Sequence, residues 1–282
     1  MISGRTALYG VVGHPVAHSL SPAMHNAAFA EAGIDAVYLA LPLPPERLFE
    51  GVRGAHAIGF QGLNVTVPHK QRAAEICLTL DPVAAVAGAV NTLRRTGDGW
   101  EGYNTDAPAT LALLEAAGVR SGARALLLGA GGAARAGAWA LLKAGCRVGL
   151  AARRPEPAEE LRAAMAGAFP GASIAAVAWE AAPAVAPRAD VVVNATSIGL
   201  SRDGAPSPVP LAPGQVAVDF VYGDTPFARE AARAGAALVS GEHILVRQGA
   251  LSFALWTGRA APEAAMAAAL RAAAGGAQGG RT

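Results

Sequence analysis

The 282-residue sequence has only two cysteines, little charge and few aromatic residues. Cys77 and Cys146 have no C-x-x-C or metal-ligand spacing, which excludes a disulfide scaffold and a cysteine-based metal site. A formal net charge of +2 without a basic stripe argues against a nucleic-acid or membrane surface partner. No apolar run reaches the length of a membrane span without a Lys or Arg in it, and Gly10 and Gly13 interrupt any leader-like segment. We therefore expect a cytoplasmic protein that uses no metal.

The most informative stretch is a short apolar run, 125–128, that ends in glycines and continues into a helix-forming segment. It carries the pattern G-x-G-x-x-A at Gly129, Gly131 and Ala134. The first glycine allows a tight bend, the second lets the backbone approach a pyrophosphate, and the third small residue lets helix and strand pack closely. A second strand follows at 147–151, as a dinucleotide-binding βαβ unit requires. The pattern predicts a dinucleotide site.

The end of that second strand favours NADP over NAD. An NAD site usually has an acid there to accept from the ribose hydroxyls, whereas this chain has Ala152, Arg153 and Arg154. Two guanidinium groups can pair with a 2′-phosphate. A solvated surface loop is the alternative, because Pro155 follows directly.

The order of strands and helices predicts an α/β fold with two domains. Residues 1–105 form a mostly parallel α/β substrate-binding and catalytic domain, joined through helices at 106–117 and 242–274. Residues 118–241 form a doubly wound, Rossmann-type domain with strands at 125–128, 147–151, 174–178, 190–194, 215–220 and 237–240. The C-terminal helical stretch is expected to pack back on the first domain. The segment 201–213, rich in proline and glycine, is expected to be a surface loop.

The first domain gathers polar residues at predicted strand and helix ends, and each has an ordinary explanation when taken alone. Ser21 suits the N-cap of a helix that begins at Pro22. Asp106 suits the start of a helix, and Lys70, in a predicted first helical turn, suits a solvated surface position. The spacing of these residues does not bring them together.

A set of ordered motifs resembles the shikimate dehydrogenase family over residues 7 to about 258. The motifs are Gly13-x-Pro15 through Ser19-x-Ser21-Pro22, Asn64-Val-Thr-Val-Pro-His-Lys70, Gly88-Ala-Val-Asn-Thr92, Asn104-Thr-Asp106, Gly129-Ala-Gly-Gly-Ala133, Asn194-Ala-Thr196, Thr225-Pro-Phe227 and Gln248. The resemblance implies NADP-linked interconversion of shikimate and 3-dehydroshikimate, a step of aromatic amino-acid biosynthesis on the way to chorismate.

The resemblance also implies roles for individual residues. Ser19 and Ser21 would hold the substrate carboxylate with Tyr222 close by, and Asn64, Thr66, Asn91, Asp106 and Gln248 would bind the ring hydroxyls. Lys70 would be the acid/base and Asp106 its partner, since a proton must move with the hydride. The cofactor would lie on Gly129, Ala130, Gly131, Gly132 and Ala133, on Arg153 and Arg154, and near Thr196, Phe220 and Gly241.

Two departures from the family pattern leave alternatives open. Many relatives have Asn-Arg-Thr where this chain has Ala152-Arg153-Arg154, and Gly-Leu-Gly-Met where it has Gly241-Glu242-His243-Ile244. The alternatives are a quinate/shikimate dehydrogenase of broader specificity, a non-catalytic NADP-binding sensor, and another two-domain NADP enzyme such as a methylene-tetrahydrofolate dehydrogenase. The protein is expected to be a monomer or a homodimer.

Overall fold

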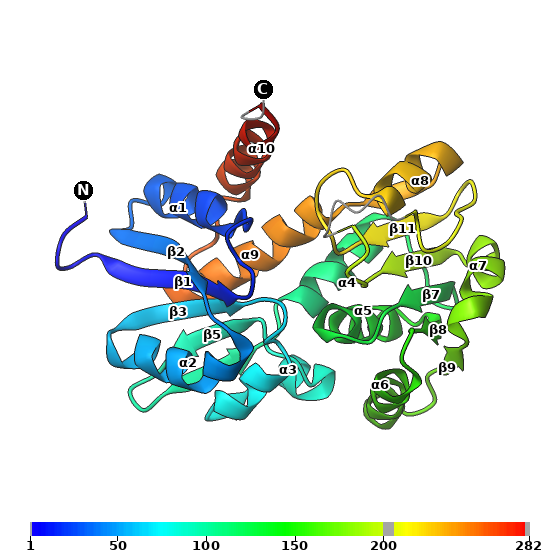
Figure 1. Ribbon diagram of the computed structural model, residues 1–282, viewed down its shortest axis with the longest axis horizontal. Helices are drawn as coiled ribbons and strands as arrows, with labels where there is room; N and C mark the ends of the chain where they lie inside the picture. The colour runs from blue at the N-terminus through cyan, green and yellow to red at the C-terminus, as the bar shows by residue number, and fades with distance from the viewer. Residues whose placement is uncertain (1, 200–205, 280–282) are drawn as a thin grey trace. The chain divides into compact units, whose positions relative to one another are not determined.

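A computed structural model describes residues 2–199 and 206–279, and in it the chain forms two units (Figure 1). Unit 1 holds the chain up to Thr105 and again from Leu245 onward, and unit 2 holds Asp106–Ile244. The described residues of each unit form a six-stranded sheet with helices around it. The predicted α/β class with two domains is confirmed. None of the described helices is long and apolar enough to span a bilayer.

The sheet of unit 1 is parallel on one side and antiparallel on the other. Its strands are β1 Ala7–Gly13, β2 Ala36–Pro42, β3 Phe60–Val65, β4 Thr79–Leu80, β5 Thr92–Arg95 and β6 Trp100–Tyr103, in the order β2-β1-β3-β5-β6-β4. β1 pairs in parallel with β2 and β3, whereas β5 is antiparallel to β3 and β6. The segments that follow β1 and β3 therefore leave the sheet at the same edge.

Helices cover both faces of this sheet. The α-helices are α1 Ser21–Glu31, α2 Leu48–Ala57, α3 Pro82–Ala87, α9 Gly241–Thr257 and α10 Glu263–Gly279, and the 3₁₀ helices are η1 Pro45–Arg47 and η2 Arg72–Ile76. The first residues of α9 belong to unit 2. Val11 and Val12 are neighbours in β1 and point to opposite faces. Val12 lies in an apolar cluster with Leu48 of α2, and Val11 in another with Phe253 of α9 and Met266 of α10. α10 lies beside α1 (Figure 1), so the predicted return of the C-terminal helices to this part of the chain is confirmed.

Unit 2 contains a parallel sheet in which β7 to β9 follow one another toward one edge and β10 to β12 toward the other. Its strands are β7 Arg124–Leu128, β8 Arg147–Ala151, β9 Ile174–Val177, β10 Val191–Asn194, β11 Val216–Asp219 and β12 Ala237–Val239, in the order β12-β11-β10-β7-β8-β9. Its helices are α4 Asp106–Ala116, α5 Gly132–Lys143, α6 Pro155–Ala168, α7 Ala182–Val185, α8 Pro226–Ala234 and the 3₁₀ helices η3 Trp179–Ala181 and η4 Ala186–Arg188. The chain order reverses between β7 and β10, and ligands bind such sheets at the carboxyl ends of the strands there.

Several local predictions were wrong. The residue before the first helix is Leu20, with no side-chain cap, and Ser21 is already helical. The segment after Lys70 is a 3₁₀ helix that starts only at Arg72, followed by a short strand, β4, that the sequence did not indicate. The last helical stretch is broken at Gly258, where φ is +68°. Of the loop predicted at 201–213, residues 201–205 lie outside the described residues, and Val209 and Leu211 beyond them are buried.

Candidate active site

The glycine turn of unit 2 comes directly after β7 and has the geometry that its sequence predicts. Gly129 has φ +110°, a backbone conformation that residues with a side chain rarely adopt. A Cβ at this position would lie 2.7 Å from the carbonyl oxygen of Ala195. The chain just after β7 therefore lies against the chain just after β10, and the close contact requires a residue without a side chain at position 129. Ala134 is fully buried against the sheet, as the third small position requires.

The helix that follows the turn presents its N-terminus without a side-chain cap. Gly131 is the N-cap of α5, its backbone is extended, and no Cβ at this position would meet another atom within 4 Å. The first N–H groups of a helix need acceptors and carry a partial positive charge, so they can bind phosphate oxygens. The open space and the bare N-terminus fit the pyrophosphate of a dinucleotide.

The other predicted cofactor residues lie at the same edge of the sheet, each after a strand end. Arg153 and Arg154 are exposed after β8, whose last residue Ala151 pairs with Leu128 and accepts a hydrogen bond from the Gly129 N–H at 2.8 Å. Thr196 follows β10, Phe220 follows β11, and Gly241 follows β12 as the first residue of α9. The fold thus brings this predicted set to the carboxyl edge of one parallel sheet.

A buried carboxylate that sequence reasoning missed holds the loops beside Thr196 and Phe220. Asp219 accepts hydrogen bonds from Asn194 Nδ2 at 2.9 Å, the Val221 N–H at 3.1 Å and Thr225 Oγ1 at 2.5 Å. Asn194 in turn accepts from Thr196 Oγ1 at 2.7 Å through its Oδ1. Burial raises the pKa of Asp219 to about 6, against the lowering effect of its hydrogen bonds. Its position at the end of an apolar strand, as the last residue of β11, was the signal available in the sequence.

Unit 1 contains a buried network of amides and hydroxyls. Asn64 Nδ2 donates to Thr92 Oγ1 at 3.0 Å and to Ser252 Oγ at 3.0 Å. Asn91 Nδ2 donates to Gln248 Oε1 at 3.2 Å and to Thr105 Oγ1 at 2.9 Å. The Thr92 and Ser252 hydroxyls are 2.8 Å apart, and each lies 3.2 Å from the Thr105 hydroxyl, which joins the two groups into one network.

The network joins three of the predicted substrate-binding residues, Asn64 of β3, Asn91 just before β5 and Gln248 of α9. Thr105 and Ser252 were missed as site residues. Ser252 lies four residues after Gln248 and so shares its helix face, which is a signal that the sequence carried. Such clustered donors and acceptors suit a ligand with several hydroxyl groups.

Lys70 and Thr66 belong to the segment that leaves β3. The Thr66 N–H donates to the carbonyl oxygen of Val12 at 2.9 Å, and the Val90 N–H donates to that of Lys70 at 2.7 Å. These bonds tie the backbone of the segment to β1 and to the residues just before β5. The buried His69 contacts the carbonyl oxygen of Leu43 through Nε2 at 2.7 Å, which fixes the chain next to Lys70.

The remaining predicted residues divide between the units. Ser19 lies before α1, where its Oγ accepts from the Ser21 N–H at 3.3 Å. Asp106 opens α4 and is 5% exposed, and Tyr222 follows β11; both belong to unit 2. The pairing of Lys70 with Asp106 stays a prediction.

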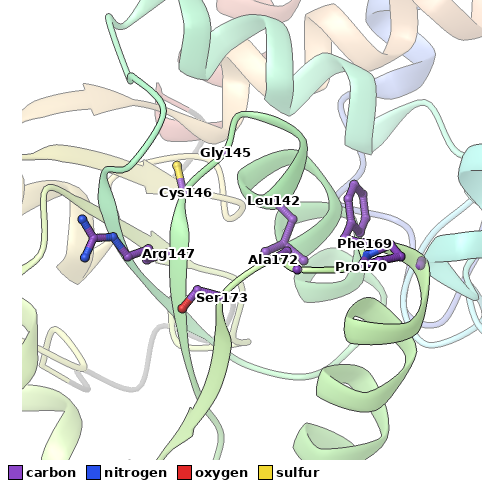
Figure 2. Close-up of a pocket in the computed structure, with 10 residues that line it drawn as sticks. Leu142, Gly145, Cys146, Arg147, Phe169, Pro170, Ala172 and Ser173 are labelled. Atoms are coloured by element: carbon purple, nitrogen blue, oxygen red, sulfur yellow. The ribbon is translucent and has the colours of Figure 1, made fainter.

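A pocket of about 540 Å³ in unit 2 is unrelated to the predicted site (Figure 2). Gly145, Cys146 and Arg147 at the start of β8 line it, with Ser173 before β9. It therefore lies at the amino ends of these strands, opposite the glycine turn. Burial raises the pKa of the Cys146 thiol to about 11, so this cysteine is not an activated nucleophile.

A doubly wound parallel sheet with this glycine turn, together with a second α/β unit that holds a buried polar network, defines a two-domain oxidoreductase that uses a nicotinamide dinucleotide. Two family models match the chain: the shikimate dehydrogenase substrate binding domain at residues 11–93, and the shikimate 5′-dehydrogenase C-terminal domain at residues 241–271. The shikimate dehydrogenase (NADP(+)) of Anaeromyxobacter sp. (strain K) is 64% identical over 273 residues, covering 96% of this chain and 98% of its own.

Solved structures agree. Shikimate dehydrogenase from Aquifex aeolicus superposes with a TM-score of 0.87 at 36% identity, over 96% of this chain and 100% of that one. Shikimate 5-dehydrogenase from Thermus thermophilus, in complex with NADP(H) and shikimate, has a TM-score of 0.84 at 39% identity, over 95% and 99%. The chain belongs to the shikimate dehydrogenase family, and the resemblance expected from its motifs is confirmed.

Proposed function

We propose that this chain catalyses the reversible NADPH-dependent reduction of 3-dehydroshikimate to shikimate, on the way to chorismate and the aromatic amino acids. The observation that carries the proposal is the buried network of unit 1, in which Asn64, Asn91 and Gln248 are brought together. A ring with several hydroxyls needs paired donors and acceptors, and each one left unpaired costs about 1–3 kcal/mol. The relative from Thermus thermophilus, solved with NADP(H) and shikimate, supports the same ligands.

The two units divide the work in this proposal. Residues 1–105 and the returning C-terminal helices bind the substrate, and residues 118–241 bind NADP. Ser19 and Ser21 hold the carboxylate together with Tyr222, while Asn64, Thr66, Asn91, Asp106 and Gln248 bind the ring hydroxyls. The N-terminus of α5 and the turn Gly129–Ala133 bind the pyrophosphate. Thr196, Phe220 and Gly241 would lie near the nicotinamide side of the cofactor.

The chain's own residues supply positioning and proton transfer. NADPH, when bound, supplies the hydride. Lys70 donates a proton to the substrate oxygen as the carbonyl becomes a hydroxyl, and it takes the proton back in the reverse direction. Asp106 holds the lysine and a ring hydroxyl in place. Such acid/base catalysis typically contributes about 10²–10⁴-fold to the rate.

Arg153 and Arg154 select NADP over NAD. No acid stands at the end of β8 to accept from a ribose hydroxyl, and both exposed guanidinium groups can pair with the 2′-phosphate. The enzyme works in the cytoplasm as a monomer or homodimer, with no nucleic-acid or membrane partner.

The test is NADP⁺ reduction followed by the absorbance of the reduced nicotinamide, with shikimate and quinate measured separately and NAD⁺ in parallel. Turnover with shikimate and NADP⁺ alone is the expected result. Comparable rates with quinate or NAD⁺ would indicate the broader quinate/shikimate enzyme. Tight NADP⁺ binding without turnover of either substrate would indicate the sensor instead.

A further inference from the structure

Tyr38 crosses a strand to reach Asn64. It lies on β2 and pairs with Tyr9 of β1, whereas Asn64 lies on β3 and pairs with Val11 of β1. Tyr9 and Val11 are two residues apart, so Tyr38 and Asn64 project from the same face of the sheet. The Tyr38 hydroxyl donates to Asn64 Oδ1 at 2.7 Å. A tyrosine on the outermost strand thus spans the neighbouring strand to hold an amide of the candidate site.

Helix α1 fixes this tyrosine at three points. Asn26 Nδ2 donates to the Tyr38 carbonyl oxygen at 2.9 Å, and its Oδ1 accepts from the Tyr38 N–H at 2.8 Å. The His25 ring stacks on the Tyr38 ring at 4.4 Å between centroids and 9° between planes. Tyr38 is 1% exposed, so these contacts leave it one position.

The Asn64 amide is held at both of its ends, because its NH₂ group also donates to the backbone carbonyl oxygen of Asn91 at 3.2 Å. Its oxygen accepts from Tyr38, so its NH₂ group is directed to Thr92 Oγ1 and Ser252 Oγ. Without the hydroxyl, the amide oxygen loses this donor inside the protein, and the amide can rotate away from the network.

We propose that Tyr38 is a positioning residue for substrate, which aligns Asn64 through its hydroxyl. The inference rests on the proposed function of unit 1 and adds a specificity-determining group to it. Tyr38 acts on the ring-hydroxyl end of the substrate, because its hydroxyl holds the amide of a residue proposed to bind there. It contributes nothing to the binding of NADP.

The test compares Tyr38→Phe with Tyr9→Phe. Both remove one hydroxyl from the same apolar cluster, and within the described residues Tyr9 has no hydrogen bond to Asn64. We expect Tyr38→Phe to raise KM for shikimate about tenfold, with kcat and KM for NADP⁺ within about twofold of wild type, because uniform binding is lost. Tyr9→Phe should leave all three constants unchanged.

A double-mutant cycle with Asn64→Ala shows whether Tyr38 acts through Asn64. If it does, Tyr38→Phe should raise KM for shikimate much less in the Asn64→Ala background than in the wild type. Full additivity, an equal effect of Tyr9→Phe, or a parallel rise in KM for NADP⁺ would overturn the inference. A wild type that turns over shikimate normally would in that case leave the proposed function standing. Calorimetric titration of wild type and Tyr38→Phe with shikimate gives the same comparison without turnover; a wild type that binds no shikimate would overturn both.

Discussion

The two units build their candidate sites from different groups. In unit 2 the binding groups are backbone N–H groups at the start of α5, made accessible by Gly129 and Gly131. In unit 1 they are side-chain amides and hydroxyls that come from three distant parts of the chain and bond to one another. A backbone site is contiguous in sequence and depends on small residues, whereas a side-chain site exists only after folding. The first suits a cofactor shared by many enzymes, and the second suits one particular substrate.

The units also differ in the ionisable group that each one buries. Unit 1 encloses His25, which is fully buried and whose pKa burial lowers to about 3. Unit 2 encloses Asp219, whose pKa burial raises to about 6. Both groups are thereby favoured in their neutral forms, but they make the stability of the two units respond to pH in opposite directions.

The largest effect expected is the acid sensitivity caused by His25. Its folded-state pKa lies below the ordinary 6.5, so the unfolded chain binds more protons between those values. The stabilising contribution is complete above pH 6.5 and is lost as the pH falls toward 3, by about 5 kcal/mol over the whole window. We expect His25→Leu to flatten the dependence of the free energy of unfolding on pH in this range. Chemical denaturation from about pH 4 to 7 measures it, with the same substitution at the exposed His243 as control.

Removal of the proposed proton donor should damage unit 1 alone. We expect Lys70→Met to lower kcat about a hundredfold to ten-thousandfold, because the proposed proton donor is then lost. KM for NADP⁺ and NADP⁺ affinity in calorimetry should not change. Arg72→Met, which alters a neighbouring exposed cation, serves as control. Retention of wild-type kcat in Lys70→Met would assign the proton transfer to another group.

Much of the fold and of unit 2's site could be predicted from the sequence, and the reasons are physical. Short apolar strands alternate with helices, and Gly129 with Gly131 marks a turn that few other residues tolerate. The network of unit 1 could not be derived this way, since Asn64 and Ser252 are far apart in the chain and each is common in ordinary structure. The resemblance to a family supplied Asn64, Asn91 and Gln248, and only the folded chain revealed Thr105, Ser252 and Tyr38.

The segment after β3 shows why local patterns fail. Lys70 was expected in the first turn of a helix, but its carbonyl oxygen accepts from the N–H of Val90, a residue much further along the chain. That bond competes with helix formation, and a 3₁₀ turn begins only at Arg72. Tertiary hydrogen bonds decided the local structure here.

Asp219 provides the opposite pH response in unit 2. Its folded-state pKa of about 6 exceeds the ordinary 3.8, so the folded state holds a proton that the unfolded chain has lost. The contribution to stability is present below pH 3.8 and is lost as the pH rises to about 6, by on the order of 3 kcal/mol. Asp219→Asn keeps acceptors for Asn194 and Val221, although its NH₂ group must replace the oxygen that faces Thr225.

We therefore expect Asp219→Asn to be more stable than wild type above about pH 6, and the advantage to shrink toward about pH 4. Denaturation at several pH values measures it. Asp224→Asn, at an acid whose side chain is 72% exposed and paired with Arg229, is the matched control. A difference between Asp219→Asn and wild type that is constant with pH would rule out the buried carboxylate as its cause.

The smallest effect expected is the loss of cofactor preference when an arginine after β8 is removed. Arg153 and Arg154 are exposed, so in the proposed function each would pair with the 2′-phosphate in a contact that water screens. We expect Arg153→Ala or Arg154→Ala to raise KM for NADP⁺ about tenfold, or ~1.4 kcal/mol. KM for NAD⁺ should stay the same, because NAD⁺ lacks that phosphate. Arg162→Ala, at an arginine of α6 that pairs with Glu159, is the control for general charge.

Salt provides a second readout of the same contact. Raising the salt concentration should reduce the difference in KM for NADP⁺ between wild type and the Arg153 or Arg154 variants, since screening weakens the phosphate contact itself. The Arg162 variant should show no such change relative to wild type. An equal rise in KM for both cofactors would instead mean that the arginines stabilise the loop and do not bind the 2′-phosphate. Other residues at the carboxyl edge of the unit 2 sheet would then have to determine the preference for NADP⁺.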